Sequence, residues 1–347
     1  MLIKKKIRIV VVDDSLFLRT LISKMFADED DIHIVALAKN ATEAQQHIDK
    51  YNPDIVVSDI EMPGMNGLEL VKTVMAKKPV KFIIMSSLSC SVFEVLQAGA
   101  VDFIRKPDMS DAENKERFKT SLITCIKQAA KANLKAAVSS STAPQRTQNL
   151  TISSTGDCDI IAIGASTGGT QTITEVLKDI PRNCPPIVIV QHMPPGYTKM
   201  FADRLNQLCK INVKEATSGS VLHKGTAVVA PGGVQSVVKK TSDGTYVISC
   251  RGEEKISGHC PSVDNLFESV AKVAGARSIG VLLTGMGRDG ARGMLSMKKS
   301  GAYTIGQNKE SSIVYGMPCE AYKLGAVTKQ LPHTAIAEDI VNRLNKS

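Results

Sequence analysis

The sequence predicts an α/β protein with two doubly wound domains of parallel sheet that a flexible linker joins. Short apolar runs rich in β-branched residues alternate with helical patterns in both halves of the chain. Continuous apolar strands of this kind are typical of parallel sheets that helices cover on both faces. The length of 347 residues fits two domains of about 100–200 residues each. A segment rich in Ser and Thr separates the two halves.

The first half contains five predicted strands. These strands are the apolar runs 7–12, 32–38, 55–57, 81–85 and 102–104, of which the third leads into Asp59. Helical patterns at 15–27 and 42–50 follow the first two strands. We expect Thr42 to be the N-cap of the second helix. The alternation predicts one parallel sheet within residues 1–130.

The boundary between the halves is a polar segment. Half of residues 139–156 are Ser or Thr, and none is aromatic. Because such a segment cannot bury enough apolar surface to offset its ordering entropy, we assign 131–156 as a linker and 157–347 as the second domain. Within the second domain the predicted strands are 160–163, 186–190, 227–230 and 278–283.

Charge and composition limit the classes of function. The net charge is +9, with a neutral first domain, +3 in the linker and +6 in the second domain, which favours an acidic partner for the second domain. Aromatic residues make up 4% and Trp is absent, so a nucleic-acid partner is disfavoured. The chain has neither a membrane-length apolar run nor a signal-peptide pattern, so we expect no membrane insertion. Eight scattered cysteines without a C-x-x-C pair disfavour structural zinc and disulfides and suit a reducing cytoplasm.

Five polar residues stand at the carboxyl ends of strands in the first domain. They are Asp13 and Asp14 after the first strand, Asp59 after the third, Ser86 after the fourth and Lys106 after the fifth. Clustered carboxylates suit a hard divalent cation such as Mg²⁺. A cation, an ammonium group and a hydroxyl are also what a phosphoryl group needs during transfer. The set predicts that Asp59 accepts a phosphoryl group.

The first domain resembles a response-regulator receiver domain, which has a flavodoxin-like fold. The resemblance rests on Val-Val-Val-Asp-Asp-Ser at 10–15, Ser-Asp-Ile-Glu-Met-Pro-Gly-Met-Asn-Gly at 58–67 and Phe-Ile-Arg-Lys-Pro at 103–107. It implies phosphorylation at Asp59, with Mg²⁺ held by Asp13, Asp14, Asp59 and the backbone carbonyl of Glu61. It also implies switch roles for Ser86, Phe103 and Lys106, and a cis bond between Lys106 and Pro107.

Three residues at predicted strand ends suggest a hydrolytic site in the second domain. Ser166, between Gly164 and Gly168, matches the G-x-S-x-G turn that exposes a nucleophile. A Ser hydroxyl needs a base, which His192 at the end of the next strand could supply. Asp289 after a later strand could orient that imidazole, and backbone N–H groups around Met286 could hold an oxyanion.

Three other interpretations compete with a Ser166–His192–Asp289 site. A dinucleotide loop is disfavoured because Ser166 replaces the middle glycine of G-x-G-x-x-G and Gln191-His192 replaces the expected acid. His259 is a rival base. An ordinary α/β-hydrolase would need a later His, for which only His333 is available, without a supporting glycine pattern.

The second domain resembles the catalytic domain of chemotaxis protein-glutamate methylesterases, which has a Rossmann-like fold. The segments that carry this resemblance are Ile-Gly-Ala-Ser-Thr-Gly-Gly at 163–169, Val-Gln-His-Met-Pro at 190–194, Pro-Gly-Gly at 231–233, Pro-Ser-Val-Asp-Asn-Leu-Phe at 261–267, Leu-Thr-Gly-Met-Gly-Arg-Asp-Gly-Ala at 283–291 and Val-Tyr-Gly-Met-Pro at 314–318. The resemblance implies Ser166 as nucleophile, His192 as base and Asp289 as its orienting group. It implies an oxyanion donor at Met286, with Thr167 as a neighbour in the site. Cys260 departs from the family, which frequently has a basic or polar residue there.

Together the two resemblances imply a phosphorylation-activated hydrolase for chemotactic adaptation. The substrates would be glutamate methyl esters of chemoreceptors, with methanol released, and certain receptor glutamines, by deamidation. The phosphodonor would be a chemotaxis histidine kinase. Mg²⁺ would serve the receiver domain, and hydrolysis would need no cofactor. Two alternatives stay open: a phospho-dependent scaffold with a degenerate second domain, and an esterase for a non-chemotaxis receptor.

Overall fold

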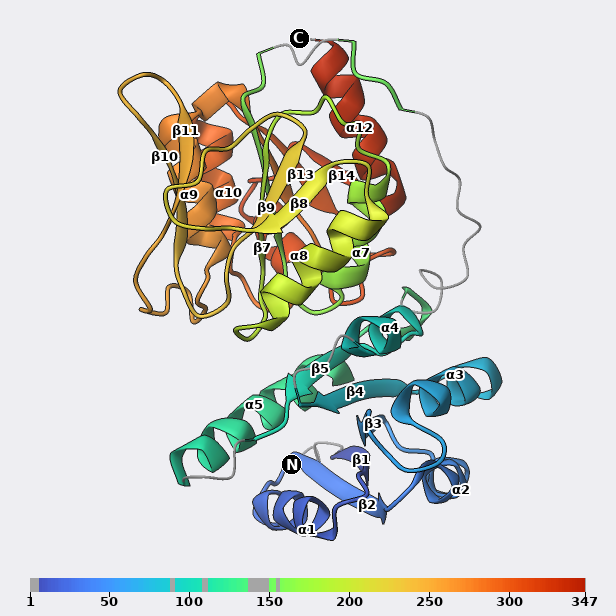
Figure 1. Cartoon of the computed structure of the whole chain (residues 1–347). Helices are drawn as coiled ribbons and strands as arrows, with labels where there is room; N and C mark the ends of the chain where they lie inside the picture. Colours follow the sequence, from blue (N-terminus) through green and yellow to red (C-terminus); the bar gives the residue numbers. More distant parts are fainter. Residues whose placement is uncertain (1–5, 88–90, 108–111, 137–149, 154–156, 347) are drawn as a thin grey trace. The chain divides into compact units, whose positions relative to one another are not determined.

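The computed structural model describes residues 6–87, 91–107, 112–136, 150–153 and 157–346. The chain divides into two compact units, residues 1–143 and 144–347 (Figure 1). Most of the predicted linker, at 137–149 and 154–156, lies outside the described residues.

The first unit is a five-stranded parallel sheet in the order β2-β1-β3-β4-β5. Helices α2, α3 and α4 cover one face, and α1 and α5 cover the other (Figure 1). The elements are β1 (Ile7–Val12), α1 (Leu16–Met25), β2 (Ile32–Ala38), α2 (Ala41–Tyr51), β3 (Ile55–Asp59), α3 (Gly67–Lys77), β4 (Lys81–Ser86), α4 (Ser91–Gln97), β5 (Asp102–Arg105) and α5 (Ala112–Ala130). All five predicted strands are confirmed.

The second unit is a seven-stranded parallel sheet in the order β14-β13-β12-β6-β7-β9-β8. Its strands are β6 (Ile160–Ala165), β7 (Ile187–Gln191), β8 (Asn212–Glu215), β9 (Thr226–Val229), β12 (Ser278–Leu282), β13 (Tyr303–Gln307) and β14 (Lys329–Leu331). Its helices are α7 (Gly169–Lys178), α8 (Tyr197–Leu208), α9 (Val263–Val273), α10 (Ala291–Lys299), α11 (Met317–Lys323) and α12 (His333–Asn345). Figure 1 shows α7, α8 and α12 on one face and α9 and α10 on the other. The α/β fold class with two parallel-sheet domains is confirmed.

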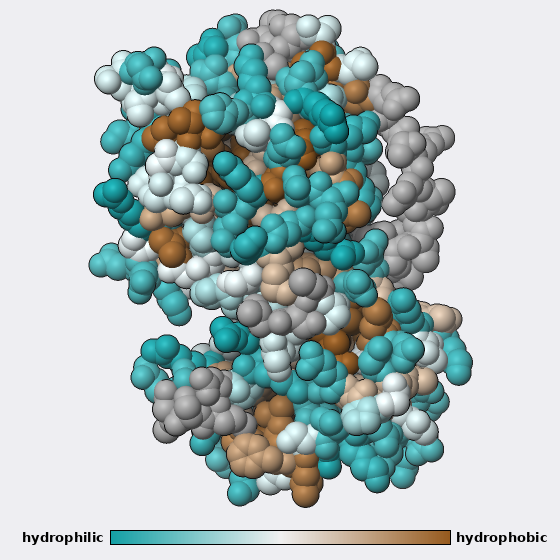
Figure 2. Space-filling view, viewed as in Figure 1, coloured by the Kyte–Doolittle hydropathy of each residue, from teal (hydrophilic) through white to brown (hydrophobic). Residues whose placement is uncertain are grey.

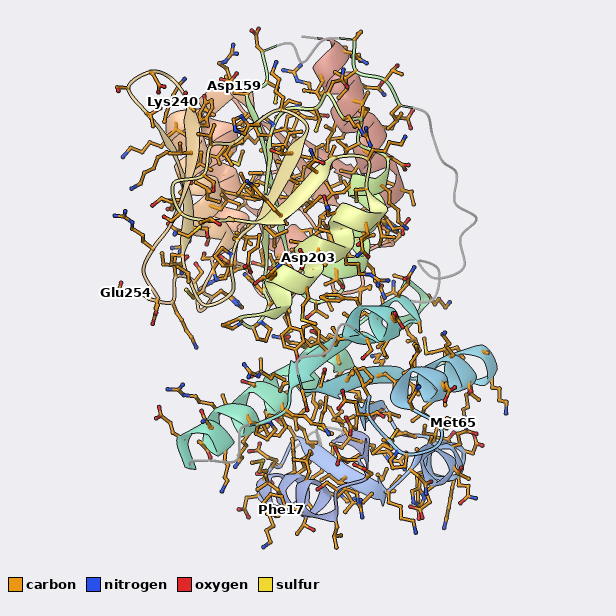
Figure 3. All side chains as sticks on the ribbon, viewed as in Figure 1. Phe17, Met65, Asp159, Asp203, Lys240 and Glu254 are labelled. Carbon is orange, nitrogen blue, oxygen red and sulfur yellow. The ribbon has the colours of Figure 1, made fainter. Side chains whose placement is uncertain are left out.

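An antiparallel hairpin stands apart from the large sheet. It consists of β10 (Ser236–Lys240) and β11 (Tyr246–Cys250). The Tyr246 hydroxyl donates to Asp159 at 2.9 Å, and Lys240 lies 4.9 Å above the Tyr246 ring. Figure 3 labels Asp159 and Lys240 close together at this end of the unit. These contacts tie the hairpin to the residues that precede β6.

Two local expectations from the sequence are wrong. The N-cap of α2 is Asn40, whose side-chain oxygen accepts from the Glu43 N–H at 2.9 Å, so Thr42 lies inside the helix. Asn satisfies the free N–H groups of a helix start at least as well as Thr. Among the described residues the cis peptide bond is at Cys260–Pro261, and Lys106–Pro107 has the trans form that is the default for X–Pro.

Four residues of the predicted linker are packed against the second unit. Ile152 is buried, and its carbonyl accepts from the Asn183 side chain at 2.7 Å. The Asn345 side chain accepts from the Ser153 N–H at 2.8 Å and donates to the Thr151 carbonyl at 3.0 Å. Residues 150–153 are therefore part of the second unit, because one apolar side chain and two amide side chains hold them there.

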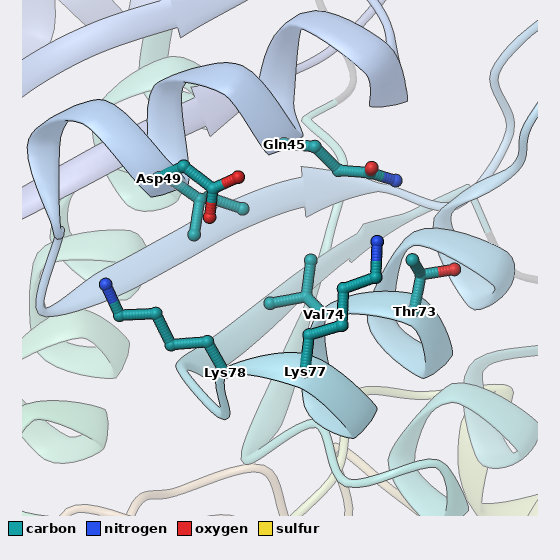
Figure 4. A pocket seen from close by; sticks show the side chains of 7 residues that line it. Gln45, Asp49, Thr73, Val74, Lys77 and Lys78 are labelled. Carbon is teal, nitrogen blue, oxygen red and sulfur yellow. The ribbon is translucent and has the colours of Figure 1, made fainter.

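The surface of the described residues carries scattered apolar side chains and a pocket in the first unit. Within the described residues, none of the helices is both long and apolar enough to span a membrane. Figure 2 shows a visible face that is mainly hydrophilic, with small separate hydrophobic patches. A shallow pocket lies between α2 and α3, where Asp49 and Gln45 face Lys77 and Lys78 (Figure 4). It contains none of the residues predicted to act in either domain.

Gly67 fixes the backbone around Asp59, and its replacement tests this packing. A Cβ at Gly67 would lie 2.3 Å from the Asp59 carbonyl oxygen and 2.8 Å from the Ile60 Cα. We expect Gly67→Ala to destabilise the first unit by about 3 kcal/mol, because backbone atoms must move. Gly64→Ala is the control: it has φ +79° but open space around it, and should cost about 1 kcal/mol. Hydrogen exchange of the β3 amides measures both, and equal protection in the two variants would contradict the prediction.

Candidate functional site

The first site is an acidic pocket at the carboxyl ends of β1 and β3. Asp13 and Asp59 are buried, Asp14 is exposed, and one carboxylate oxygen of each lies within 4.8 Å of the others. The Ser15 N–H fixes Asp13 at 2.9 Å, and the Glu61 N–H donates to Asp59 at 3.2 Å. Three carboxylates so close together repel unless a cation neutralises them, and oxygen donors of this kind suit Mg²⁺. The pocket could therefore hold a divalent ion.

Lys106 supplies the positive charge of this pocket. Its ammonium lies 3.0 Å from Asp13 and 2.6 Å from Asp59. Burial raises the pKa of Asp59, and this effect exceeds the opposing effect of Lys106. Burial lowers the pKa of Lys106, but Asp59 and Asp13 together outweigh it and raise that pKa. The lysine therefore stays protonated beside the carboxylate that the sequence predicts as phosphoryl acceptor.

The remaining predicted residues of the first site lie around this pocket. Ser86 ends β4 and is buried, and its carbonyl accepts from the Lys106 N–H at 2.8 Å. Phe103 is half-buried in the neighbouring strand β5, paired in register with Ile84. Glu61 follows β3 at the same edge of the sheet. The structure thus gathers all the predicted residues at one sheet edge, although Phe103 belongs to the strand and not to the pocket.

The second site lies at the carboxyl ends of three adjacent central strands. Ser166 follows β6, His192 follows β7, and Asp289 lies in the loop between β12 and α10. The sheet order β12-β6-β7 makes these strands neighbours, and adjacent strands are about 4.8 Å apart. The chain leaves β6 toward β7 on one side and later returns as β12 on the other. Such a switch point is where open α/β sheets bind ligands.

Asp289 is held by the start of helix α9. Its carboxylate accepts from the Ser262 hydroxyl at 2.7 Å, the Val263 N–H at 2.8 Å and the Asp264 N–H at 3.0 Å. A helix N-terminus favours negative charge because its first N–H groups lack partners within the helix. Burial raises the pKa of Asp289, but the hydrogen bonds from His192, Asp264 and Ser262 outweigh it and lower that pKa. Asp289 is therefore an ionised acceptor.

His192 donates its Nε2–H to Asp289 at 2.8 Å. Since an ionised carboxylate only accepts, this bond assigns a proton to Nε2, and in the neutral imidazole Nδ1 then carries the lone pair. Among the residues that the structure describes, the buried Nδ1 has no hydrogen-bond partner. The His192 N–H also donates to the Ala165 carbonyl at 3.2 Å, which places His192 beside the residue that precedes Ser166. The unpaired nitrogen is thus available to a hydroxyl at this edge of the sheet.

Ser166 lies on a turn that its neighbours hold from two sides. Its N–H donates to the Thr284 carbonyl at 3.0 Å, and its carbonyl accepts from the Gln191 side chain at 2.9 Å. A Cβ at Gly285 would lie 2.8 Å from the Ser166 Cβ, so only glycine lets the two loops approach this closely. Helix α7 begins three residues later, at Gly169. Ser166 therefore has the positive end of a helix dipole nearby.

The oxyanion candidates lie on the loop that Gly285 starts. Val314 accepts from the Gly285 N–H, and Gly285 accepts from the Gly316 and Met317 N–H groups. Within the described part of the chain, the Met286 N–H is not used in any hydrogen bond, so it is free to donate to a ligand. Thr167 is buried, and its carbonyl accepts from the Thr284 hydroxyl at 3.0 Å.

The two rival bases occupy different places. His333 begins α12 after β14, which lies three strands from β6 at the sheet edge. His259 lies on the His192 ring, with centroids 3.8 Å apart and planes 7° apart. Burial, followed by repulsion from His192, lowers the pKa of His259 to about 4. Cys260 is half-buried beside it, and its thiol makes a long contact of 3.9 Å to the Gly252 carbonyl.

Sequence reasoning missed the residues that support these groups. Gln191, Thr284 and Ser262 each bond directly to Ser166 or Asp289, and Gln235 anchors the loop that carries His259. Gln191, Ser262 and Thr284 stand within the segments that carry the family resemblance, and Ser262 also precedes a helical pattern as an N-cap residue would. The others are polar residues at strand ends or in loops, whose partners are distant in sequence.

The low pKa of His259 predicts a pH dependence of stability. Between pH 6.5 and about pH 4, the unfolded chain binds a proton at His259 that the folded protein does not. The free energy of unfolding should therefore fall as the pH falls through this range. We expect His259→Phe to show a smaller decrease, because its ring cannot take up the proton. Urea unfolding at several pH values measures this, and parallel curves for the two proteins would contradict it.

Comparison with known proteins assigns each domain to a family. Residues 161–340 match the CheB methylesterase family and residues 9–115 match the response regulator receiver domain family. A protein-glutamate methylesterase/protein-glutamine glutaminase from Syntrophomonas wolfei is 43% identical over 347 residues, 99% of each chain. A protein of that name from Escherichia coli K12 is 40% identical over 344 residues, 98% of this chain and 97% of that one. The crystal structure of the Thermotoga maritima CheB methylesterase catalytic domain is similar with a TM-score of 0.52 at 34% identity, covering 54% of this chain and 98% of that one. This chain therefore belongs to the CheB family of protein-glutamate methylesterases/protein-glutamine glutaminases that carry a response regulator receiver domain.

Proposed function

We propose that this protein hydrolyses γ-glutamyl methyl esters on chemoreceptors and deamidates receptor glutamines, under the control of phosphorylation at Asp59. Family membership supports the reaction class. The observation that carries the proposal is the His192–Asp289 hydrogen bond of 2.8 Å beside Ser166, with the second imidazole nitrogen left unpaired among the described residues. This arrangement is what a serine hydrolase needs in order to activate a hydroxyl.

The proposed reaction begins when the Ser166 hydroxyl attacks the side-chain carbonyl carbon of the substrate. Its proton passes to Nδ1 of His192, and Asp289 stabilises the imidazolium through the Nε2–H bond. The tetrahedral intermediate collapses when His192 returns the proton to the leaving group, so that methanol or ammonia departs. Water then attacks the acyl-enzyme, gives a proton to His192, and releases the free glutamate together with the restored Ser166 hydroxyl.

The oxyanion of both tetrahedral intermediates would lie against backbone donors. The free Met286 N–H is one donor, on the loop that contacts Ser166. Thr167 is the next residue along the Ser166 turn. Ester hydrolysis should be faster than deamidation, because an amine must be protonated before it can leave. The proposed hydrolysis uses side chains and backbone of the second unit alone and needs no cofactor.

The first unit would act as the switch. Asp59 would attack the phosphoryl group of a chemotaxis histidine kinase, and Lys106 would contact the new phosphoryl oxygens. Mg²⁺ bound by Asp13, Asp14, Asp59 and the Glu61 carbonyl would neutralise the phosphoryl oxygens. Ser86 and Phe103, on adjacent strands β4 and β5, would respond to the new group. We assign the domains as 1–130 and 157–347, joined by a linker at 131–156 whose residues 150–153 pack against the second unit. We assign the protein to the cytoplasm.

The basic charge of the second domain fits the proposed substrate. Its net charge of +6 comes from 22 basic and 16 acidic residues, and it would attract the acidic helices of chemoreceptor signalling regions. A degenerate scaffold would not need the unpaired nitrogen at His192.

The triad is tested by methanol release from a purified methylated chemoreceptor. We expect Ser166→Ala and Asp289→Asn to lower the rate by about 10⁴-fold, because one removes the nucleophile and the other removes the charge that fixes the imidazole. Ser242→Ala is the matched control, since Ser242 is exposed in the turn of the hairpin, and it should retain the full rate. A Ser166→Ala variant that still releases methanol would refute the triad, and inactivity of the wild type would favour a scaffold or another substrate.

The switch is tested with a small-molecule phosphodonor and Mg²⁺. In Asp59→Asn the rates with and without phosphodonor should coincide, because the amide cannot accept the phosphoryl group, whereas the wild type should be stimulated. Asp49→Asn provides the matched control, since Asp49 is exposed on α2, and stimulation should persist in it. If the phosphodonor still stimulates Asp59→Asn, phosphorylation at this residue does not control the enzyme.

A further inference from the structure

The loop between β11 and α9 places a second imidazole against the proposed base. His259 lies in this loop, and its ring is parallel to that of His192, at 3.8 Å between centroids and 7° between planes. The hydrogen bond to Asp289 fixes one atom of the His192 ring, but a single hydrogen bond leaves the ring free to rotate about the bond axis. A parallel ring in contact removes that freedom.

We propose that His259 is a positioning residue, whose stacked ring holds the His192 imidazole in the plane where Nε2 meets Asp289 and Nδ1 faces Ser166. This inference rests on the proposed function, because it takes His192 as the base. It replaces the interpretation of His259 as a rival base. The geometry matters because a reacting group displaced by about 1 Å can lose about 100-fold in rate.

Gln235 holds His259 in place. Its buried side-chain amide donates to the Glu254 carbonyl at 2.8 Å and to the His259 carbonyl at 2.9 Å. Figure 3 labels Glu254 at the outer part of this loop. The Gln235 N–H donates to the Gly252 carbonyl, and the Gln235 carbonyl accepts from the Arg251 N–H, both at 2.8 Å. The loop is therefore attached along its length to one residue that precedes β10.

The same side-chain amide of Gln235 connects the loop to the start of helix α9, which holds Asp289. Its oxygen accepts from the Ser262 N–H and from the Asn265 side chain, both at 3.1 Å. Ser262 in turn donates its hydroxyl to Asp289. Gln235 thus joins His259, which stacks on the His192 ring, to the helix start that fixes Asp289, the hydrogen-bond partner of that ring. All four hydrogen-bonding positions of this amide are used, as expected for a buried side chain that rigidifies its surroundings.

The electrostatics of the stack suit a base that becomes charged during the reaction. With its pKa at about 4, His259 is neutral at neutral pH. When His192 takes the proton from Ser166, it therefore lies against an uncharged ring that does not repel it. A charged neighbour would repel the imidazolium instead.

Two substitutions at His259 separate positioning from proton transfer. In the full-length protein with methylated chemoreceptor, we expect His259→Ala to lower kcat by about 10–100-fold with little change in KM, because the misplaced base affects the chemical step. His259→Phe, which keeps an aromatic ring but has no nitrogen, should stay within a few-fold of the wild type. His223→Ala is the control for an exposed histidine and should be fully active. Thermal unfolding of each variant is measured first, and the assays are run at a temperature at which every variant is folded.

Proton NMR gives a readout that does not depend on turnover. The Nε2 proton of His192, bonded to a carboxylate, should resonate far downfield as a sharp signal in the wild type and in His259→Phe. It should broaden by solvent exchange in His259→Ala. Gln235→Glu, which keeps the size of the side chain but turns two donor contacts into repulsion, should lower kcat in the same direction as His259→Ala.

Other results with these variants would contradict the proposed roles of His259 and Gln235. Full kcat in His259→Ala would refute positioning, and loss of activity in His259→Phe would show that a His259 nitrogen takes part in the chemistry. Full activity in Gln235→Glu would refute the anchoring role of Gln235. Failure of the proposed function is distinguishable, because methanol release by Ser166→Ala would refute the triad whatever the His259 variants do.

Discussion

The second domain depends on the carboxylate of Asp289 at the start of helix α9. This one group satisfies three donors from Ser262, Val263 and Asp264 and still accepts from His192. A buried carboxylate without such donors would be costly and would become protonated. Because these donors keep it ionised, Asp289 determines that Nε2 of His192 carries the proton. The opposite nitrogen, Nδ1, is then the atom at which the imidazole can accept a second proton.

Close approach of loops gives this arrangement its rigidity. Gly285 lets its loop lie against the Ser166 Cβ, and Gly169 leaves room for the Gln191 side chain, which a Cβ would meet at 2.0 Å. Gly293 allows α10 to approach the Asp264 backbone, where its N–H donates to the Asp264 carboxylate at 2.8 Å. Gly169 and Gly285, which belong to the sequence motifs, and Gly293, which follows one, are therefore explained by close packing of loops and helices.

Each domain has a buried aspartate at the carboxyl end of its sheet, and the pKa values of the two aspartates shift in opposite directions. Asp59 lies in a pocket where burial exceeds the effect of Lys106, so its pKa is raised. Asp289 receives enough hydrogen bonds to outweigh its burial, so its pKa is lowered. The opposite pKa shifts of these two aspartates therefore come from their neighbours, since the residue type is the same.

The sequence by itself determined the elements with continuous apolar runs and the chemistry at their ends. The five strands of the first sheet and the central strands β6, β7 and β12 were predictable, because buried parallel strands have an apolar pattern that no other short element shares as clearly. Edge strands β8 and β14 were not, since one is half-exposed and polar and the other is three residues long. Only the tertiary structure decided the attachment of residues 150–153 and the stacking of His259 on His192. Each of these depends on contacts between residues that are distant in sequence, and a local sequence pattern does not specify them. Partners such as Gln235 and Ser262 meet only when the loops between the strands pack together over the sheet.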